Sequence, residues 1–232
     1  MRFFRTLAVA ALAFTGFAAQ AADLPARVAP MPPLPMPYNW TGFYVGAQGG
    51  YGWSDTSYAF TATATGASHS GDGWFVGGRV GYNYQFVNNL VLGVEGEANW
   101  SDIDGSTSCP GAGFTCGHKV RWFGSVNGRL GYAIDRLLLV ADGGVAFADM
   151  RYRSTATATG VLFGTGYSET FVGWTIGGGA EYALTNNLIV SLNYKYYDFR
   201  SKTAPIGAVS SISPGKFNPT MHTVRVGLAY KF

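Results

Sequence analysis

Apolar and polar residues alternate with a period of two along most of the chain after Asn39, and this alternation limits the fold more than any other feature. In segments 74–86, 90–100 and 120–134 the even-numbered positions are mostly apolar, and charged or amide residues stand at odd-numbered positions. This pattern is typical of strands with one apolar and one polar face. Each run is longer than ten residues. Tilted transmembrane strands have ~9–11 residues and soluble strands average ~5–6, so the sequence predicts strands that cross a membrane.

The chain contains eight such segments, and the other five are 40–53, 137–150, 171–184, 188–199 and 220–232. Three short connectors are predicted hairpin turns, since Asn tolerates the positive φ that such turns require: 87–89, 135–136 and 185–187. Four longer connectors are rich in Ser, Thr, Ala and Gly: 54–72, 101–119, 151–169 and 200–219. We therefore predict an all-β fold, an eight-stranded antiparallel transmembrane β-barrel with short periplasmic turns and four long extracellular loops.

The N-terminus has the composition of a secretory signal. Arg2 and Arg5 precede the apolar stretch 7–19, and Ala19-Gln20-Ala21 offers small residues at a cleavage position. Residues 1–22 are therefore predicted to be a cleaved signal peptide. Residues 23–38 contain six of the ten prolines and predict an extended periplasmic spacer. The predicted barrel domain comprises residues 39–232.

The charge balance excludes one class of partner. Charged residues make up 12% of the chain, about half the usual share of roughly 25%. Without Arg2 and Arg5 the chain has 14 basic and 13 acidic residues, a net charge of +1. A charge this small argues against nucleic acid as a partner.

The two cysteines agree with export. Cys109 and Cys116 bracket a short Gly-containing loop, and we predict a disulfide between them in an oxidising compartment. Their spacing differs from the Cys-x-x-Cys of zinc or redox motifs.

Aromatic residues mark one end of the predicted strands. Four tyrosines recur at intervals of 50, 50 and 48 residues near the short turns and the C-terminus: Tyr82, Tyr132, Tyr182 and Tyr230. Aromatic rings at one level of a transmembrane barrel form an interfacial girdle. The last strand is apolar at every second position through Phe232. Tyr230 and Phe232 resemble the C-terminal signature that the outer-membrane assembly machinery recognises in bacterial barrels.

The segment NWTGFYVG at 39–46 follows the predicted signal and spacer. It resembles the opening of an alphaproteobacterial outer-membrane β-barrel family, porin-like, that includes major surface proteins of Brucella. The resemblance extends over residues 23–232 and includes GYNY at 81–84 and YKF at 230–232. It implies the cell outer membrane as location, but its motifs identify no ligand.

The polar faces of the predicted strands carry charges of both signs into the lumen. The predicted lumen charge network comprises Arg79, Glu95, Glu97, Arg121, Arg129, Asp142, Glu181, Lys195 and Arg225, with Lys231 as a further basic residue. An eight-stranded barrel is just wide enough for its own side chains, so we expect these charges to pair and fill the lumen. A narrow ion path along them is the alternative.

Motifs for catalysis or cofactor binding are absent from the sequence. It contains no Gly-x-Ser-x-Gly, Walker or His-Glu-x-x-His motif. His69, His118 and His222 share no metal-ligand spacing and are interpreted as solvated loop residues, although some members of the resembled family are reported to bind haemin. A catalytic His222 with a loop Ser and Asp is a weaker alternative. We predict no enzyme, no cofactor and no metal.

The predicted function is that of an integral outer-membrane β-barrel protein with a structural or surface role in the envelope. The alternatives are a small porin-like channel for ions or small solutes, and binding of haemin or another surface ligand through the outer loops. Expected partners are outer-membrane lipids, the assembly machinery and a surface ligand. The hexamer TATATG at 61–66 and 155–160 is a candidate for that last contact, or only a spacer.

Overall fold

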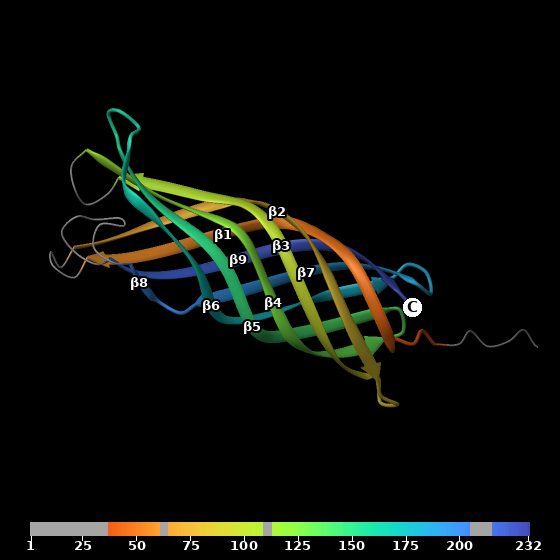
Figure 1. The fold of residues 1–232 in the computed structure, drawn as a ribbon. Coiled ribbons are helices and arrows are strands. Elements are labelled where there is room, and N and C mark those ends of the chain that lie inside the picture. The colour runs from red at the N-terminus through yellow and green to blue at the C-terminus, as the bar shows by residue number, and fades with distance from the viewer. Residues whose placement is uncertain (1–36, 61–64, 109–112, 205–214) are drawn as a thin grey trace, which may run out of the picture. The chain divides into compact units, whose positions relative to one another are not determined.

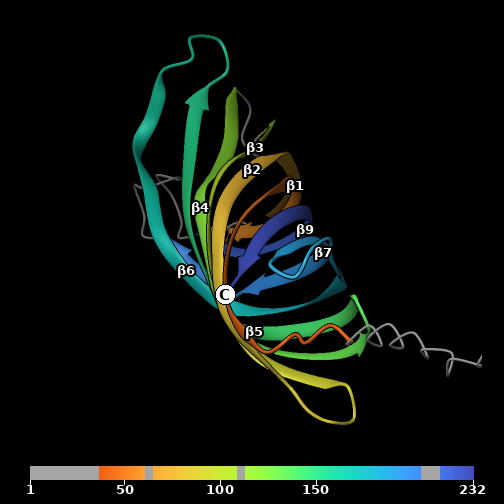
Figure 2. The same ribbon diagram turned by 90° about the vertical axis from the view of Figure 1, so that its right-hand side faces the viewer.

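The computed structural model describes residues 37–60, 65–108, 113–204 and 215–232. Within these ranges nine strands form one antiparallel sheet, and β1 pairs with β9 to close it into a barrel (Figures 1 and 2). The strands are β1 (Gly42–Phe60), β2 (Thr65–Gln85), β3 (Leu90–Ser108), β4 (Phe114–Ile134), β5 (Leu137–Ala156), β6 (Leu162–Ala183), β7 (Leu188–Phe199), β8 (Lys202–Ala204) and β9 (Gly215–Lys231). Both β7 and β8 pair with β9, one after the other, so they share one position in the wall. The predicted eight-stranded barrel is confirmed.

The described part of the chain contains no helix that is long and apolar enough to span a membrane. Residues 1–22 and most of the spacer at 23–38, both defined above from the sequence, lie outside the described residues.

The short connectors lie at the end of the barrel that also holds the C-terminus (Figure 1). Asn89 and Asp135 have φ values of 64° and 50°, the left-handed conformation predicted for these tight turns. The turns are tied to neighbouring strands as well, because the amide of Ala133 donates to the carbonyl of Asn89 at 2.9 Å.

The strands are longer than predicted. Six of them have 19 to 22 residues, so they continue through most of the segments expected to be loops. The reading of 54–72, 101–119 and 151–169 as loops along their whole length is therefore wrong. Beyond the membrane the outer face of a strand is no longer apolar, so the alternation weakens although the hydrogen-bonded ladder continues. Thr-rich sequence favours that continuation.

The outer face of the barrel carries an apolar band between two aromatic girdles. The girdle near the short turns includes Phe43, Tyr84, Tyr132, Tyr182, Tyr230 and Phe232, and the other includes Tyr51, Trp53, Trp74, Trp100, Trp122 and Trp174. On β2 the two levels are marked by Tyr84 and Trp74, roughly 33 Å apart along the strand at ~3.3 Å per residue. At a tilt of ~40° this is about 25 Å along the barrel axis, the height of an outer-membrane apolar band.

The outer end of the barrel wall is uneven. β7 ends at Phe199, opposite Gly173, so the part of β6 before Gly173 pairs only with β5 among the described strands. The β5–β6 hairpin accordingly stands clear of the wall at this end (Figure 2). Lys202 of β8 spans the gap with a 3.0 Å ion pair to Glu169 of β6.

Candidate functional site

The lumen is the main concentration of polar chemistry in the described structure. Eight of the nine residues of the predicted network line it and are at most 8% exposed: Arg79, Glu95, Glu97, Arg129, Asp142, Glu181, Lys195 and Arg225. They are four cations and four acids, so their formal charges cancel. Burial of ions is tolerated when each is paired and hydrogen-bonded.

The first half of the network joins two arginines to two glutamates. Arg79 lies 2.9 Å from Glu181 and 3.5 Å from Glu95. Arg129 lies 2.7 Å from Glu181 and 3.3 Å from Glu95. The hydroxyl of Tyr44 donates to Glu95 at 2.8 Å and accepts a hydrogen bond from Arg129. Each charge of this half therefore has more than one partner.

The second half is centred on Glu97. Arg225 donates to one carboxylate oxygen of Glu97, and Tyr197 donates to the other at 2.9 Å. Lys195 lies 3.3 Å from Glu97 and 2.7 Å from Asp142. A weaker contact of 3.9 Å between Lys195 and Glu95 connects the two halves. The network is continuous across the lumen.

Strand register and one small residue make room for this arrangement. In the β2–β3 ladder Arg79 is opposite Glu97 and Gly81 is opposite Glu95, so these positions share the inner face. A Cβ at Gly81 would lie 2.3 Å from the hydroxyl oxygen of Tyr44. Gly81 thus admits the tyrosine that bridges Glu95 and Arg129.

Arg121 does not belong to the network, and its predicted place in the lumen is wrong. A register shift between Val120 and Trp122 places Arg121 in a β-bulge of β4. Its side chain is 49% exposed and lies 3.3 Å from Asp149. The extra residue of a bulge shifts the alternation by one position, so the odd-number rule that holds for Arg129 fails beyond it.

Between the charge network and the extracellular end, the lumen is filled by apolar side chains. This outer aromatic layer comprises Phe75, Ile103, Val120, Phe123, Ala146, Ala148, Met150, Tyr152, Phe171, Tyr197, Phe199 and Met221. The Phe123 ring lies 5.1 Å from Phe75 and 5.6 Å from Tyr197, in edge-to-face contacts. Sequence reasoning missed this layer, although Phe75, Phe123 and Phe171 recur every 48 residues at inward positions.

The periplasmic end is closed by the residues that precede β1. Trp40 is 0% exposed and Tyr38 is 7% exposed. Both belong to an apolar cluster with residues at the strand ends next to the short turns. The Trp40 indole donates to the carbonyl of Asp135 at 3.0 Å, and its amide donates to Gln85 at 2.8 Å. The Nζ of Lys231 lies 4.4 Å from the centre of the Tyr38 ring. We call residues 38–40 the periplasmic plug, so Tyr38 packs with the barrel although the sequence placed it in the spacer.

Some buried polar atoms of the described lumen have no protein partner: Arg79 Nε, Asn83 Oδ1, Asn99 Nδ2, Asn127 Oδ1 and Arg225 Nη2. Ordered water commonly satisfies groups of this kind.

The two histidines whose side chains are described, His118 and His222, lie on opposite faces of the wall. His118 is 3% exposed inside β4, with Nε2 2.7 Å from the Ser54 hydroxyl, so its interpretation as a solvated loop residue is wrong. His222 faces outward at the Trp girdle, with Nδ1 2.7 Å from the Tyr194 hydroxyl. The side chain of His69 lies outside the described part. The described residues include no group of three or more metal-ligating side chains.

The remaining predicted site residues lie at the two ends of the barrel. Cys116 is disulfide-bonded and packs against the outer aromatic layer, whereas Cys109 lies outside the described residues. Tyr230 and Phe232 face outward at 49% and 72% exposure, and the amide of Phe232 donates to the carbonyl of Phe43 at 2.9 Å. Strand closure therefore includes the last residue of the chain.

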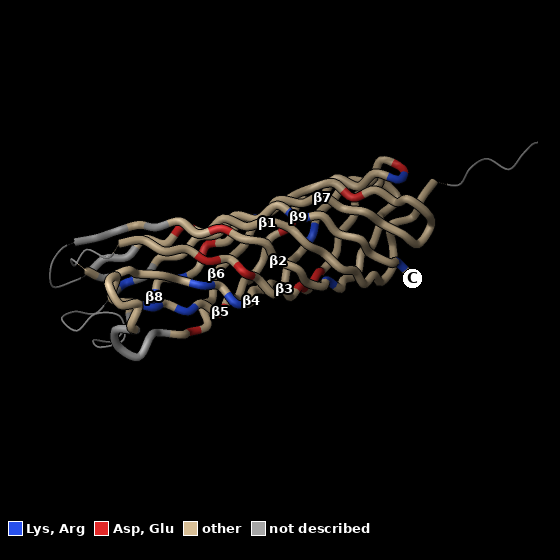
Figure 3. The backbone as a smooth tube through the Cα atoms, turned by 90° about the horizontal axis from the view of Figure 1, so that it is seen from above, with Lys and Arg blue, Asp and Glu red and all other residues tan. Residues whose placement is uncertain are grey.

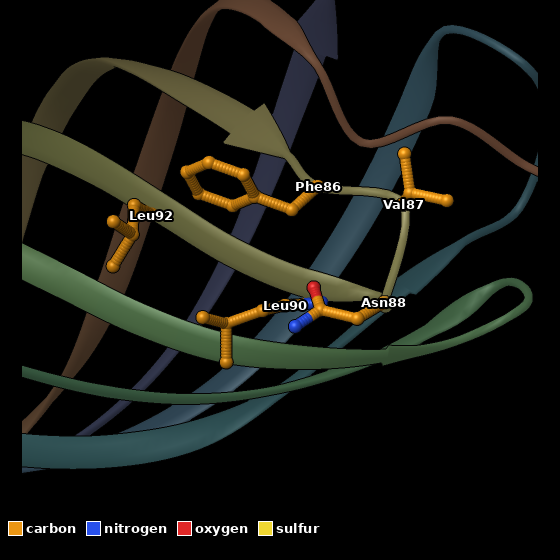
Figure 4. A pocket seen from close by; sticks show the side chains of 5 residues that line it. All are labelled: Phe86, Val87, Asn88, Leu90 and Leu92. Atoms are coloured by element: carbon orange, nitrogen blue, oxygen red, sulfur yellow. The ribbon is translucent and has the colours of Figure 1, made fainter.

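One open surface pocket of about 390 Å³ lies at the β2–β3 turn and is lined by Phe86, Val87, Asn88, Leu90 and Leu92 (Figure 4). Its lining is apolar except for Asn88, and it lies at the periplasmic girdle. It offers no group for acid–base or nucleophilic chemistry.

Comparisons with known proteins agree with this architecture. The chain matches the family model of the outer membrane protein beta-barrel domain over residues 9–232. It is 35% identical to a 31 kDa outer-membrane immunogenic protein of Brucella melitensis, covering 84% of this chain and 85% of the relative. It is 31% identical to a 22 kDa outer membrane protein of Rhizobium leguminosarum, covering 84% and 79%. The crystal structure of OprG from Pseudomonas aeruginosa matches with a TM-score of 0.51 at 11% identity, covering 84% and 98%, which is a likeness of fold. The chain belongs to the outer membrane protein beta-barrel family and is located in the outer membrane.

Proposed function

We propose that this protein is a closed, non-conducting barrel whose role in the outer membrane is structural. Its filled lumen makes it a rigid element of the membrane, and its strands extend beyond the outer leaflet. The observation that carries the proposal is the filling of the lumen at three levels: the periplasmic plug, the neutral charge network and the outer aromatic layer. A porin-like path would need to pass all three.

Charge balance supports closure over conduction. A selective pore presents rings of one sign to a passing ion. In this lumen Arg225 and Lys195 face Glu97 and Asp142 within ion-pair distance, so the charges are used within the protein. An ion entering the lumen would have to break these pairs.

We also propose that the protein is not an enzyme. Ser54 and His118 form a Ser–His contact of 2.7 Å, and both residues are at most 3% exposed. A substrate has no access to such a pair. The family model describes an outer-membrane β-barrel domain, and the names of the relatives describe outer-membrane proteins.

The C-terminal strand supports the proposal that the assembly machinery recognises this chain. Outward-facing Tyr230 and Phe232 are exposed on the strand that closes the barrel against β1. Phe232→Ser should reduce the amount of folded protein in the outer membrane, measured by the heat-dependent gel shift, while refolding in detergent proceeds as in the wild type.

The experiment that tests closure is planar-bilayer recording of the purified, folded chain. The wild type is expected to give no unitary conductance. Phe75→Ala/Phe123→Ala, which removes two rings of the outer aromatic layer, is compared with Val76→Ala/Val126→Ala, which truncates two lipid-facing side chains of the same strands. Reproducible unitary currents from the wild type would reject the closed barrel in favour of a channel.

A further inference from the structure

Four basic residues gather on the outer face of two neighbouring strands. This β4–β5 basic cluster comprises Lys119, Arg121, Arg151 and Arg153. Lys119 is directly opposite Arg151 in the ladder, and Arg153 is opposite Gly117. Like charges opposite each other on adjacent strands are destabilising, so an anion beside Lys119 and Arg151 would stabilise this arrangement. Basic positions of the outer half appear as blue segments in Figure 3.

Acidic side chains pair with two of the four basic residues, one acid from β3 and one from β5. Lys119 pairs with Asp102 at 2.5 Å, and Arg121 pairs with Asp149 at 3.3 Å. Asp104 of β3 is the other ladder neighbour of Lys119. On the far side, the β6 neighbour of Arg151 is the uncharged Ser168.

Arg151 and Arg153 therefore lack an acidic partner among the described residues. The Nε of Arg151 is also buried without any hydrogen-bond partner in that part of the structure. This buried Nε lies out of reach of an external ligand, but Arg151 is half-buried and Arg153 is exposed, so an oxyanion outside the wall meets the accessible parts of their guanidinium groups.

The level of the cluster on the wall identifies the kind of anion. Trp122 belongs to the outer girdle and lies next to Arg121 in the chain, opposite Asp149. Lys119 lies three residues farther out, roughly 10 Å along the strand at ~3.3 Å per residue. Aromatic girdles mark the boundary of the apolar band, so the cluster lies at the height of the lipid headgroups.

We propose that Arg151 and Arg153, with Lys119 beside them, bind phosphate groups of an anionic glycolipid in the outer leaflet. Guanidinium groups match phosphate oxygens with paired, charge-assisted hydrogen bonds. The lipid phosphate then separates the like charges of Lys119 and Arg151. This inference goes beyond the proposed function and holds whether or not the lumen conducts.

The test uses the full mature chain, folded in zwitterionic detergent and titrated with diphosphoryl lipid A, with retained lipid measured by native mass spectrometry. Parallel titrations use the same lipid A after enzymatic removal of its phosphates, and inorganic phosphate as a competitor. Arg151→Gln/Arg153→Gln should weaken binding of the phosphorylated lipid by at least about tenfold, since each basic residue at a membrane surface contributes about 1 kcal/mol. The dephosphorylated lipid should bind the wild type as weakly as the phosphorylated lipid binds this variant.

The matched control is Arg200→Gln/Lys216→Gln, which removes two exposed charges elsewhere on the outer half. It should change binding by less than about threefold. The heat-dependent gel shift verifies folding of each variant. Arg153→Gln alone affects an exposed residue, so it keeps the test valid if the double variant fails to fold. Equal binding of dephosphorylated lipid, equal losses in both double variants, or displacement of the lipid by inorganic phosphate at equal concentration would each overturn the proposal.

Discussion

Arg129 and Arg121 lie on the same strand, eight residues apart, but their side chains lie in opposite environments. Arg129 is 5% exposed and contacts Glu95 and Glu181 in the lumen. The Arg121 side chain is 49% exposed and has one carboxylate at 3.3 Å. The bulge at Arg121 moves this arginine out of the network. The position of a charge relative to the wall, more than its residue type, therefore sets what its loss should cost.

The largest effect is expected for Arg129→Leu. The change leaves Glu95 and Glu181 with fewer cations in a buried site, and breaking one side of a buried ion pair costs about 3–5 kcal/mol. The free energy of unfolding is measured by urea titration in lipid vesicles with tryptophan fluorescence. Arg129→Lys, which keeps the charge but loses the second contact, should recover part of the loss. Wild-type stability of the Leu variant would contradict the network's role.

A smaller loss in the free energy of unfolding is expected when one side chain of the outer aromatic layer is truncated. Phe123→Ala removes a fully buried ring that contacts Phe75 and Tyr197, at a cost of about 3 kcal/mol. Val126→Ala, on the lipid-facing side of the same strand, is the control and should cost less than half as much. Equal losses in the same urea titration would mean that the lumen is no better packed than the outer face.

The periplasmic plug should contribute about as much as one ring of the outer aromatic layer. Trp40→Ala removes one fully buried indole and its hydrogen bond to Asp135, at a cost of about 3 kcal/mol. Loss of this indole should also loosen the attachment of the segment before residue 38. Limited proteolysis of the folded variant should therefore remove that segment faster than in the wild type. Trp40→Phe keeps most of the packing and should be cleaved at nearly the wild-type rate. Unchanged cleavage in the Ala variant would argue against a plug.

The smallest effect is expected for Arg121→Gln. An exposed ion pair contributes about 0–1 kcal/mol, so unfolding should shift by less than that amount. A loss as large as that of Arg129→Leu, measured in the same vesicles, would return Arg121 to the lumen and remove the bulge from the explanation.

Much of this architecture could be predicted from alternation alone. The number of strands, the tight turns at Asn89 and Asp135 and eight buried charges follow from period-two patterning, because a barrel wall has only two faces. Arg121 could not be placed, since nothing in the sequence marks the bulge before Trp122. The sequence also does not show how far the strands extend, because outside the membrane the ladder continues without an apolar outer face.

The periplasmic plug was missed for a different reason. Residues 37–41 are irregular, so no periodicity assigns Trp40 to a face, and its burial depends on partners such as Gln85 and Asp135 that lie far away in the chain. The outer aromatic layer had a detectable signal in the 48-residue spacing of its phenylalanines.

The most direct test of a filled lumen is chemical access to a small residue inside it. Ser191 is 2% exposed in the lumen, and Ser57 is exposed on the outer part of β1. Each is changed to Cys in a Cys109→Ser/Cys116→Ser background, and labelling of the folded barrel by a small water-soluble thiol reagent is followed by mass. A closed lumen predicts rapid labelling of Ser57→Cys and none of Ser191→Cys until the protein is unfolded. Labelling of both sites at similar rates in the folded barrel would contradict it.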